Sequence, residues 1–466
     1  MTNHPDPKLR EGATSFRLRR FRWSAGVAAL AWALAGASST LAKPSRCNQP
    51  AAKPIVKVGL PGRPFEALAS ADGCWIFASF MPSVLGAPGQ GHFFRPGGIA
   101  VLRRDGGKVI VKRVVQLDPQ GTAAAGIVLT HDGKTLIATS GPMVAFLDIQ
   151  RMETGKGKPV LGFVRDGPHP GSIYDNVSAH DRFVFVSDEG MQQVSVIDFA
   201  EIRRSHFAQQ ARIRIGAIPV GNAPVGLAFS NDNRYLFVTS ELWGEPIRLP
   251  SAARTAGPPA QSAGGTKQNS WPMTCHPEMQ RVASNRQRIR WPEGAIPVVS
   301  MAQAEGGVAN PVINSVPAGC SPVRDEVLPD GKTLYVTARG SNALLAFDTA
   351  KLVTDSSHAL IATVPVGTAP VGLAVVDGGR KVVVAHSSRF GGRGGQDLTV
   401  VDVSGIRSGQ AKIEGTIPAG SFPRELHTTL DGKTLLLTNF GSEQLELIDL
   451  ARLRSVLKPP AVTRGP

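Results

Sequence analysis

A pattern that returns about every 50 residues constrains the fold of this chain more than any other feature of its sequence. Its clearest copy begins with a turn at residues 319–322 and reaches an Asp-Gly pair at residues 330–331. An apolar run at residues 334–337 follows, and the copy ends at Asp348. Asp-Gly tolerates the positive φ that a tight hairpin requires. The pattern therefore predicts short antiparallel strands, which can bury their faces only against neighbouring copies.

Seven copies of this pattern align along the chain, and each begins near a glycine. These glycines are Gly62, Gly121, Gly167, Gly221, Gly319, Gly367 and Gly420. The last copy ends after its third strand, whereas an unmatched strand-like run at residues 54–59 precedes the first copy. We therefore expect an all-β, seven-bladed β-propeller of four-stranded antiparallel blades over residues 55–458. An N-terminal strand would complete the last blade and close the ring. Residues 241–297 form an insertion in the fourth blade, and residues 459–466 form a C-terminal tail.

The sequence of each copy also resembles a known family. Residues 322–338 and 224–240 follow the pattern Pro-x-x-x-Ala-x-x-x-Asp-Gly-Lys-x-Leu-Tyr-Val-Thr most closely. This pattern resembles the YVTN-repeat family of β-propellers, including its exported, YncE-like members. The resemblance covers nearly all of residues 55–457 and implies the propeller fold. It implies little about function, because propellers carry many different activities.

The N-terminus differs from the rest of the chain. Four arginines (Arg17, Arg19, Arg20 and Arg22) precede an apolar run at residues 25–37, and small residues lead to Ala42. This order is typical of a signal peptide over residues 1–42, followed by an N-terminal extension over residues 43–54. The apolar run is shorter than the roughly 20 residues that span a bilayer. We expect an exported protein, periplasmic or extracellular, with no transmembrane segment after cleavage. The sequence leaves Sec and twin-arginine export open.

The net charge of +15 at pH 7 favours anionic partners, although a basic soluble surface would give the same value. The insertion in the fourth blade combines basic with aromatic side chains. They are Trp271, Arg281, Arg286, Arg288, Arg290 and Trp291. Arginine beside aromatic rings suits polyanions and single-stranded nucleic acid. A surface loop without a ligand is the alternative interpretation.

Four cysteines in an exported chain predict two disulfide bonds, with three possible pairings. Placement of the cysteines on the two ends of the blades favours Cys275–Cys320 and Cys47–Cys74. The chain has no Cys-x-x-Cys-His motif for haem and no His-Glu-x-x-His motif for zinc. We therefore predict neither a cofactor nor a metal.

The innermost strands should line a central channel, where the resemblance to YVTN repeats implies small residues such as Gly226 and Gly372. Other copies place large polar side chains there instead. They are Glu66, Tyr174, Arg324, Glu326, Glu425 and His427. Charges near a buried axis indicate either a structural ion network or a ligand pocket. His386, and Arg389 in a further insertion at residues 387–396, complete the candidate ligand-binding residues.

Three functions follow from these features. The leading hypothesis is a monomeric, non-enzymatic binding protein of the cell envelope or extracellular space, whose ligand lies on the loop-rich face over the channel. Its partner would be an unidentified protein or an anionic envelope ligand. The second is a lactonase-like hydrolase that uses Glu425 and His427 as an acid–base pair with Arg324 and Glu66, although no nucleophile motif supports it. The third is binding of a polyanion or single-stranded nucleic acid by the basic insertion.

Overall fold

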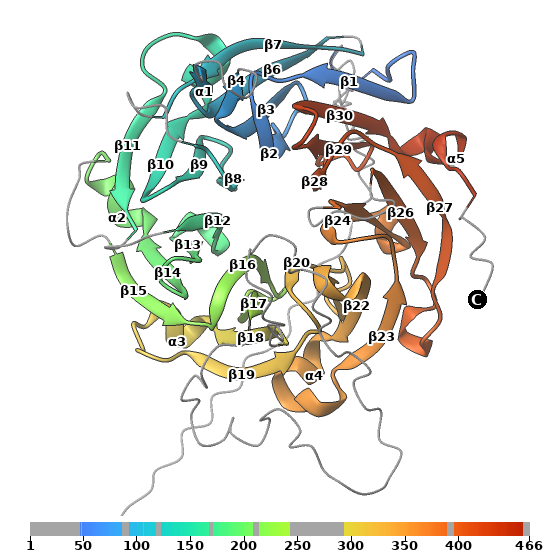
Figure 1. The fold of residues 1–466 in the computed structure, drawn as a ribbon. Helices are drawn as coiled ribbons and strands as arrows, with labels where there is room; N and C mark the ends of the chain where they lie inside the picture. Colours follow the sequence, from blue (N-terminus) through green and yellow to red (C-terminus); the bar gives the residue numbers. More distant parts are fainter. Residues whose placement is uncertain are drawn as a thin grey trace, which may run out of the picture. The chain divides into compact units, whose positions relative to one another are not determined.

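Seven four-stranded antiparallel sheets form a ring around a central channel (Figure 1). The computed structural model describes residue 47 and residues 49–85, 93–105, 107–117, 123–166, 171–207, 214–242, 293–388 and 396–459. A two-stranded sheet, β4 (Ser83–Leu85) and β5 (Phe93–Arg95), lies outside the seven. The predicted seven-bladed β-propeller is therefore confirmed.

Each blade runs from an innermost to an outermost strand. Blade 1 contains β2 (Arg63–Ala69), β3 (Trp75–Met81), β6 (Gly98–Asp105) and β7 (Lys108–Val115). Blade 2 contains β8 (Ile127–Leu129), β9 (Thr135–Ser140), β10 (Met143–Asp148) and β11 (Val160–Arg165). Blade 3 contains β12 (Ser172–Val177), β13 (Phe183–Asp188), β14 (Gln193–Asp198) and β15 (Arg214–Pro219). Blade 4 contains β16 (Asn222–Phe229), β17 (Tyr235–Leu242), β18 (Ala295–Ser300) and β19 (Val312–Pro317).

The remaining blades follow the same order. Blade 5 contains β20 (Pro322–Val327), β21 (Thr333–Ala338), β22 (Ala343–Asp348) and β23 (Leu360–Pro365). Blade 6 contains β24 (Pro370–Val376), β25 (Lys381–His386), β26 (Asp397–Asp402) and β27 (Lys412–Pro418). Blade 7 contains β28 (Pro423–Thr428), β29 (Thr434–Asn439) and β30 (Gln444–Asp449). Its outermost strand is β1 (Ile55–Gly59), which pairs antiparallel with β30 from Ile55 opposite Ile448 to Gly59 opposite Gln444. The N-terminal strand thus closes the ring, as predicted.

A hydroxyl group on the second strand of most blades joins one blade to the next. In blade 5, Oγ1 of Thr337 accepts the N–H of Arg324 at 3.1 Å and donates to the carbonyl of Val371 in blade 6 at 2.6 Å. The hydroxyls that donate to a carbonyl in, or just before, the next blade's inner strand are those of Ser79, Thr139, Thr239, Thr337 and Thr438. This bond gives a physical reason for the threonine in the repeat, because it satisfies backbone groups at the channel wall.

The aspartates that end the third strands begin short helices, which the sequence did not reveal. Asp148, Asp198 and Asp348 each accept the backbone N–H three residues later. They cap α1 (Ile149–Thr154), α2 (Phe199–Arg204) and α4 (Thr349–Thr354), as aspartate commonly does. Two further helices are α3 (Met301–Glu305) and α5 (Leu453–Val456). Among the described helices, none is both long and apolar enough to cross a membrane.

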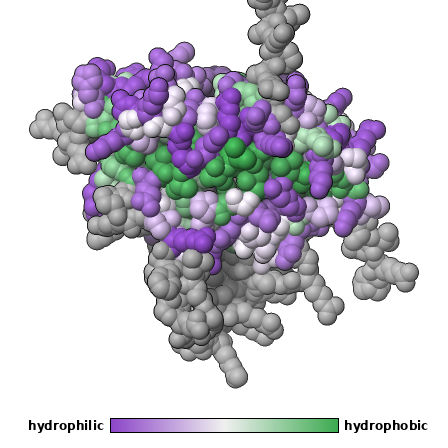
Figure 2. All heavy atoms as spheres, turned by 90° about the horizontal axis from the view of Figure 1, so that it is seen from above, coloured by the Kyte–Doolittle hydropathy of each residue, from purple (hydrophilic) through white to green (hydrophobic). Residues whose placement is uncertain are grey.

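Apolar side chains fill the spaces between neighbouring blades. Phe185 of blade 3, for example, packs with Leu236 of blade 4 and meets Phe229 edge-on, with ring centroids 5.7 Å apart. Seen from the side that carries β1 and β7 in Figure 1, an apolar band lies between two hydrophilic zones (Figure 2). Because apolar clusters fill the spaces between the blades, each sheet is covered by its neighbours, as the repeat pattern requires.

The two ends of the blades carry different connections. Because strands within a blade are antiparallel, the link between the second and third strands lies at the end where the inner strand begins. We call this end the insertion face, since residues 82–97, 243–294 and 387–396 are such links. The Asp-Gly turns lie at the opposite end.

One predicted disulfide bond is present and joins the N-terminal segment to blade 1. Cys47 is bonded to Cys74, with the two Cα atoms 5.0 Å apart. Cys275 lies outside the described residues, so the second predicted pair, Cys275–Cys320, stays a prediction.

Candidate functional site

Polar and aromatic side chains from four inner strands meet in the channel. They come from β2, β12, β20 and β28, in blades 1, 3, 5 and 7. The side chains are Phe65, Glu66, Tyr174, Arg324, Arg424, Glu425 and His427. Blades 4 and 6 carry Gly226 and Gly372 on the channel wall, as the repeat pattern predicted. Gly226 faces the carboxyl group of Asp325 and Gly372 faces the backbone of β28, so an added Cβ would collide at either position.

A salt bridge between blades 5 and 7 spans the channel. The Nε and Nη2 atoms of Arg324 donate to the two carboxylate oxygens of Glu425 at 2.8 and 2.5 Å. The hydroxyl of Tyr174 donates to the same carboxylate at 2.6 Å, and the guanidinium of Arg324 lies 3.3 Å from the centre of the tyrosine ring. The side chains of Arg324 and Glu425 are 10% and 3% exposed. These groups satisfy one another, which is what a buried ion pair requires.

Tyr174 reaches the channel through a shift in the alignment of blade 3. The sequence placed the opening turn of this blade at residues 167–170. In the structure, Ser172 pairs with Asp188, the position that the opening proline takes in most other blades. The difference is two residues, which leaves the same side chains on the same face of the strand. Tyr174 therefore lines the channel as expected.

His427 pairs with Glu66. The acid–base hypothesis had paired it with Glu425. Nε2 of His427 lies 2.7 Å from Oε1 of Glu66, and Oε2 of Glu66 accepts the N–H of Ile127 at 2.8 Å. The side chain of His427 is 35% exposed. Burial lowers its pKa, but the hydrogen bond and the negative charge of Glu66 outweigh that effect, so the pKa of His427 is raised. This pair therefore places a partly exposed acid–base group in the channel.

Two adjacent carboxyl groups in blade 5 have raised pKa values. Burial raises the pKa of Asp325 to about 8, against the opposing charge of Arg324. Burial also raises the pKa of Glu326 to about 7, although its carboxylate accepts the N–H of Val375 at 3.1 Å. Asp175 in blade 3 behaves similarly, because burial and the charge of Glu66 raise its pKa well above the usual range. The sequence identified Glu326 but missed the other two.

Arg424 is a further channel residue that the sequence analysis missed. Its guanidinium lies 3.6 Å from the centre of the Phe65 ring and 5.6 Å from that of Phe440. One nitrogen, Nη2, donates to the hydroxyl of Tyr174 at 3.4 Å. The buried Nε lies 4.0 Å from Oε1 of Glu425, too far for a hydrogen bond, and has no hydrogen-bond partner among the described residues. Blades 4, 5 and 6 have valine at this position, directly after the opening proline (Val225, Val323 and Val371). That contrast was visible in the sequence.

Arg424 lies at the mouth of the channel, at the end that belongs to the insertion face. Phe440 also contacts Phe422, with ring centroids 5.1 Å apart, and Arg63 lies 5.8 Å from the Phe440 ring. We call Arg63, Phe422, Arg424 and Phe440 the mouth cluster. Glu241 is paired with Arg339 and accepts from the hydroxyl of Ser321 at 3.1 Å.

The other candidate residues do not join this site. His386 is 1% exposed and lies within blade 6. Its Nδ1 is 2.8 Å from Asp397, and its Nε2 accepts the N–H of Gly367 at 3.1 Å. Arg389 and the basic insertion residues Trp271, Arg281, Arg286, Arg288, Arg290 and Trp291 lie outside the described residues. In the part of the chain that the structure describes, no group of three or more His, Cys, Asp and Glu side chains is arranged to hold a metal ion.

Comparisons with known proteins show the fold. No family model matches the sequence, and no curated protein matches it either. The hydrazine synthase structure from Kuenenia stuttgartiensis is 16% identical, with a TM-score of 0.53 over 85% of this chain and 97% of that one. A protein of Bacteroides uniformis assigned as a 6-phosphogluconolactonase is 17% identical, with a TM-score of 0.51 over 78% and 91% of the two chains. The periplasmic gluconolactonase of Pseudomonas aeruginosa is 19% identical, with a TM-score of 0.50 over 80% and 88%. The chain thus has the β-propeller fold that these proteins share.

Proposed function

We propose that this protein is a non-enzymatic binding propeller whose ligand carries an anionic group and lies on the insertion face, over the mouth of the channel. The observation that supports this most is Arg424, whose buried Nε has no hydrogen-bond partner among the described residues. A buried donor without an acceptor costs about 1–3 kcal/mol. An incoming carboxylate or phosphate could supply that acceptor.

The rest of the site favours binding over catalysis. Both carboxylate oxygens of Glu425 are engaged by Arg324 and Tyr174, so this carboxylate is not free to accept a proton from a substrate. The mouth cluster offers aromatic rings beside the cation of Arg424. Such an arrangement suits an anion attached to a flat, apolar group.

Thermal unfolding with phenyl phosphate as the probe tests this proposal. A ligand that binds only the folded state raises the melting temperature by mass action. We expect phenyl phosphate to raise the melting temperature of the wild-type protein and to have little effect on Arg424→Gln. Arg234→Gln is the matched control, because Arg234 also lies over an aromatic ring, Tyr235, but at the Asp-Gly end of blade 4. A shift that is equal in both variants and the wild type would refute the mouth of the channel as the binding site.

A lactonase-like hydrolase is the second candidate, and two observations favour it. The Glu66–His427 pair joins a carboxylate to a partly exposed histidine of raised pKa. The fold is also shared with the two lactonase propellers named above. Hydrolysis of δ-gluconolactone above the spontaneous rate, lost in His427→Asn and retained in Arg424→Gln, would support the hydrolase and contradict the binding proposal.

We also propose that the protein is exported, as YVTN-repeat propellers of the YncE-like type are. The Cys47–Cys74 bond supports this, because disulfide bonds persist in oxidising compartments. Fractionation of cells that express the full chain would test it, and the whole protein remaining in the cytosol would contradict it.

Binding of single-stranded DNA that weakens steeply with added salt would favour the basic insertion as the binding surface.

A further inference from the structure

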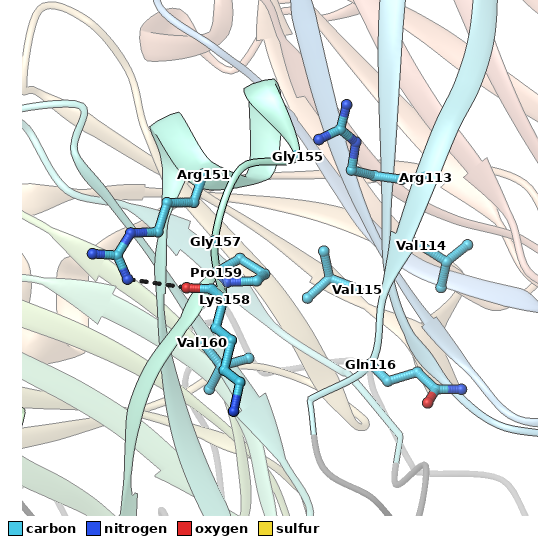
Figure 3. A pocket seen from close by; sticks show the side chains of 10 residues that line it. All are labelled: Arg113, Val114, Val115, Gln116, Arg151, Gly155, Gly157, Lys158, Pro159 and Val160. Carbon is cyan, nitrogen blue, oxygen red and sulfur yellow. Dashed lines mark hydrogen bonds between the residues drawn. The ribbon is translucent and has the colours of Figure 1, made fainter.

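A cavity on the outer edge of the ring, away from the channel, lies between blades 1 and 2. It has a volume of about 400 Å³ and is lined by the end of β7, by α1 and by the segment that leads into β11. In Figure 3, Val115 of β7 lies opposite Pro159, and Arg113 lies beside Gly155 at the end of α1. Its volume falls at the small end of the range for pockets that hold small molecules, roughly 300–1,000 Å³.

Three basic side chains line this cavity. They are Arg113 on β7, Arg151 on α1 and Lys158 before β11 (Figure 3). Among the described residues that line it, none is acidic. Arg151 is held in place, since its Nη1 donates to the carbonyl of Lys158 at 3.1 Å and its Nε lies 3.4 Å from Asp148. The cavity therefore carries a net positive charge.

Arg113 has a buried nitrogen, Nη1, that lacks a hydrogen bond to the described residues. The guanidinium rests directly on Gly155, where φ is +72°, and an added Cβ there would collide with Nη1. The left-handed conformation and the close approach both require glycine at the end of α1. The local fold thus holds an unsatisfied cationic donor beside the cavity.

The rest of the lining is largely apolar. Val114, Val115, Pro159 and Val160 contribute to it, and Val114 is 43% exposed. We propose that this cavity binds a small amphipathic anion, with one carboxylate, sulfate or phosphate group on a short apolar body. The anionic group would accept from Arg113 and Lys158, and the apolar body would cover the valines and Pro159.

Isothermal titration calorimetry of the full chain tests the proposal with hexanoate, hexyl sulfate and hexyl phosphate as probes. At least one of the three should bind, and the tightest identifies the headgroup. Hexanamide, which has the same apolar body without the charge, should bind about tenfold or more weakly, since a charge-assisted hydrogen bond is lost. Binding of none of the three anions, or equal binding of hexanamide, would overturn the proposal.

Substitutions separate this cavity from the general basic surface. Arg113→Gln should weaken binding of the tightest probe about tenfold or more. Lys112→Gln removes the same charge from the neighbouring position of β7, which does not line the cavity, and should leave binding nearly unchanged. Lys158→Gln provides a second, exposed cavity variant should Arg113→Gln fail to fold. Equal weakening by the Lys112 and cavity substitutions would show that bulk charge, and not this cavity, attracts the anion.

Discussion

Oε1 of Glu66 and Nε2 of His427 lie 2.7 Å apart, although 361 positions separate the two residues in sequence. Glu66 belongs to blade 1 and His427 to blade 7, so the contact crosses the junction where the ring closes. The strand β1 joins the same two ends of the chain on the outside of blade 7. Ring closure is therefore supported both at the rim and at the channel.

The stability contributed by this pair should fall as the pH rises. The pKa of His427 is raised in the folded protein, so the folded state holds a proton that the unfolded chain releases first. That contribution is complete below the unfolded pKa of about 6.5 and is lost as the pH passes the folded pKa. We expect His427→Asn to lower the urea unfolding midpoint more at about pH 5.5 than at about pH 9. A difference between variant and wild type that does not change with pH would contradict this.

Asp325 should impose a pH dependence of the same sign over a wider range. Burial raises its pKa to about 8, whereas an aspartate in the unfolded chain titrates near 3.9. The stability that the proton provides is complete below about pH 4 and is lost as the pH rises towards about 8. Asp325→Asn keeps the uncharged shape, so we expect it to flatten the profile and to be more stable than wild type at about pH 9. Chemical denaturation at several pH values measures this, and a variant profile parallel to wild type would rule it out.

Breaking the Arg324–Glu425 pair should be strongly destabilising. Glu425→Leu leaves the buried charge of Arg324 without its partner, which costs about 3–5 kcal/mol. Arg324→Met should cost less, because Nε of Arg424 still lies 4.0 Å from the Glu425 carboxylate. The double variant removes both charges and should recover much of that loss. Tyr174→Phe should cost about 1.5–3 kcal/mol, since it removes one hydrogen bond to a charged group. Urea unfolding of the four variants measures these free energies, and additive losses in the double variant would show that the pair is not coupled.

The fold was predictable because the same pattern of short strands and tight turns occurs seven times in the sequence. Ring closure followed from the unpaired run before the first copy, and the structure confirms it. The helices after the third strands were missed because each has only four to six residues and no periodic pattern of its own. Asp348 was recognised only as the end of its copy, although aspartate is also a preferred residue at the N-cap of a helix.

The site was predictable in its membership but less so in its pairings. Glu66, Arg324, Glu425 and His427 were identified as channel residues because they are large and polar at positions where YVTN repeats have small residues. Their partners depend on which blades adjoin across the channel and how far each side chain reaches, which no local pattern encodes. His427 was therefore assigned to Glu425, its neighbour on β28, although the structure pairs it with Glu66.

Thr337 tests the idea that hydroxyl groups join the blades. Its hydroxyl accepts the N–H of Arg324 and donates to the carbonyl of Val371 in the next blade. Thr337→Val keeps the shape of the side chain but leaves both backbone groups without this partner. We expect a loss of about 1–3 kcal/mol in the free energy of unfolding, measured by urea denaturation. Thr354→Val is the control, because that hydroxyl is exposed and only donates to a helix carbonyl.

Blade 6 has Ala385 at the position that corresponds to Thr337 and forms its junction with blade 7 without this bond. Since one junction already lacks the hydroxyl, the ring should still close in Thr337→Val, with lower stability and an unchanged far-UV circular dichroism spectrum.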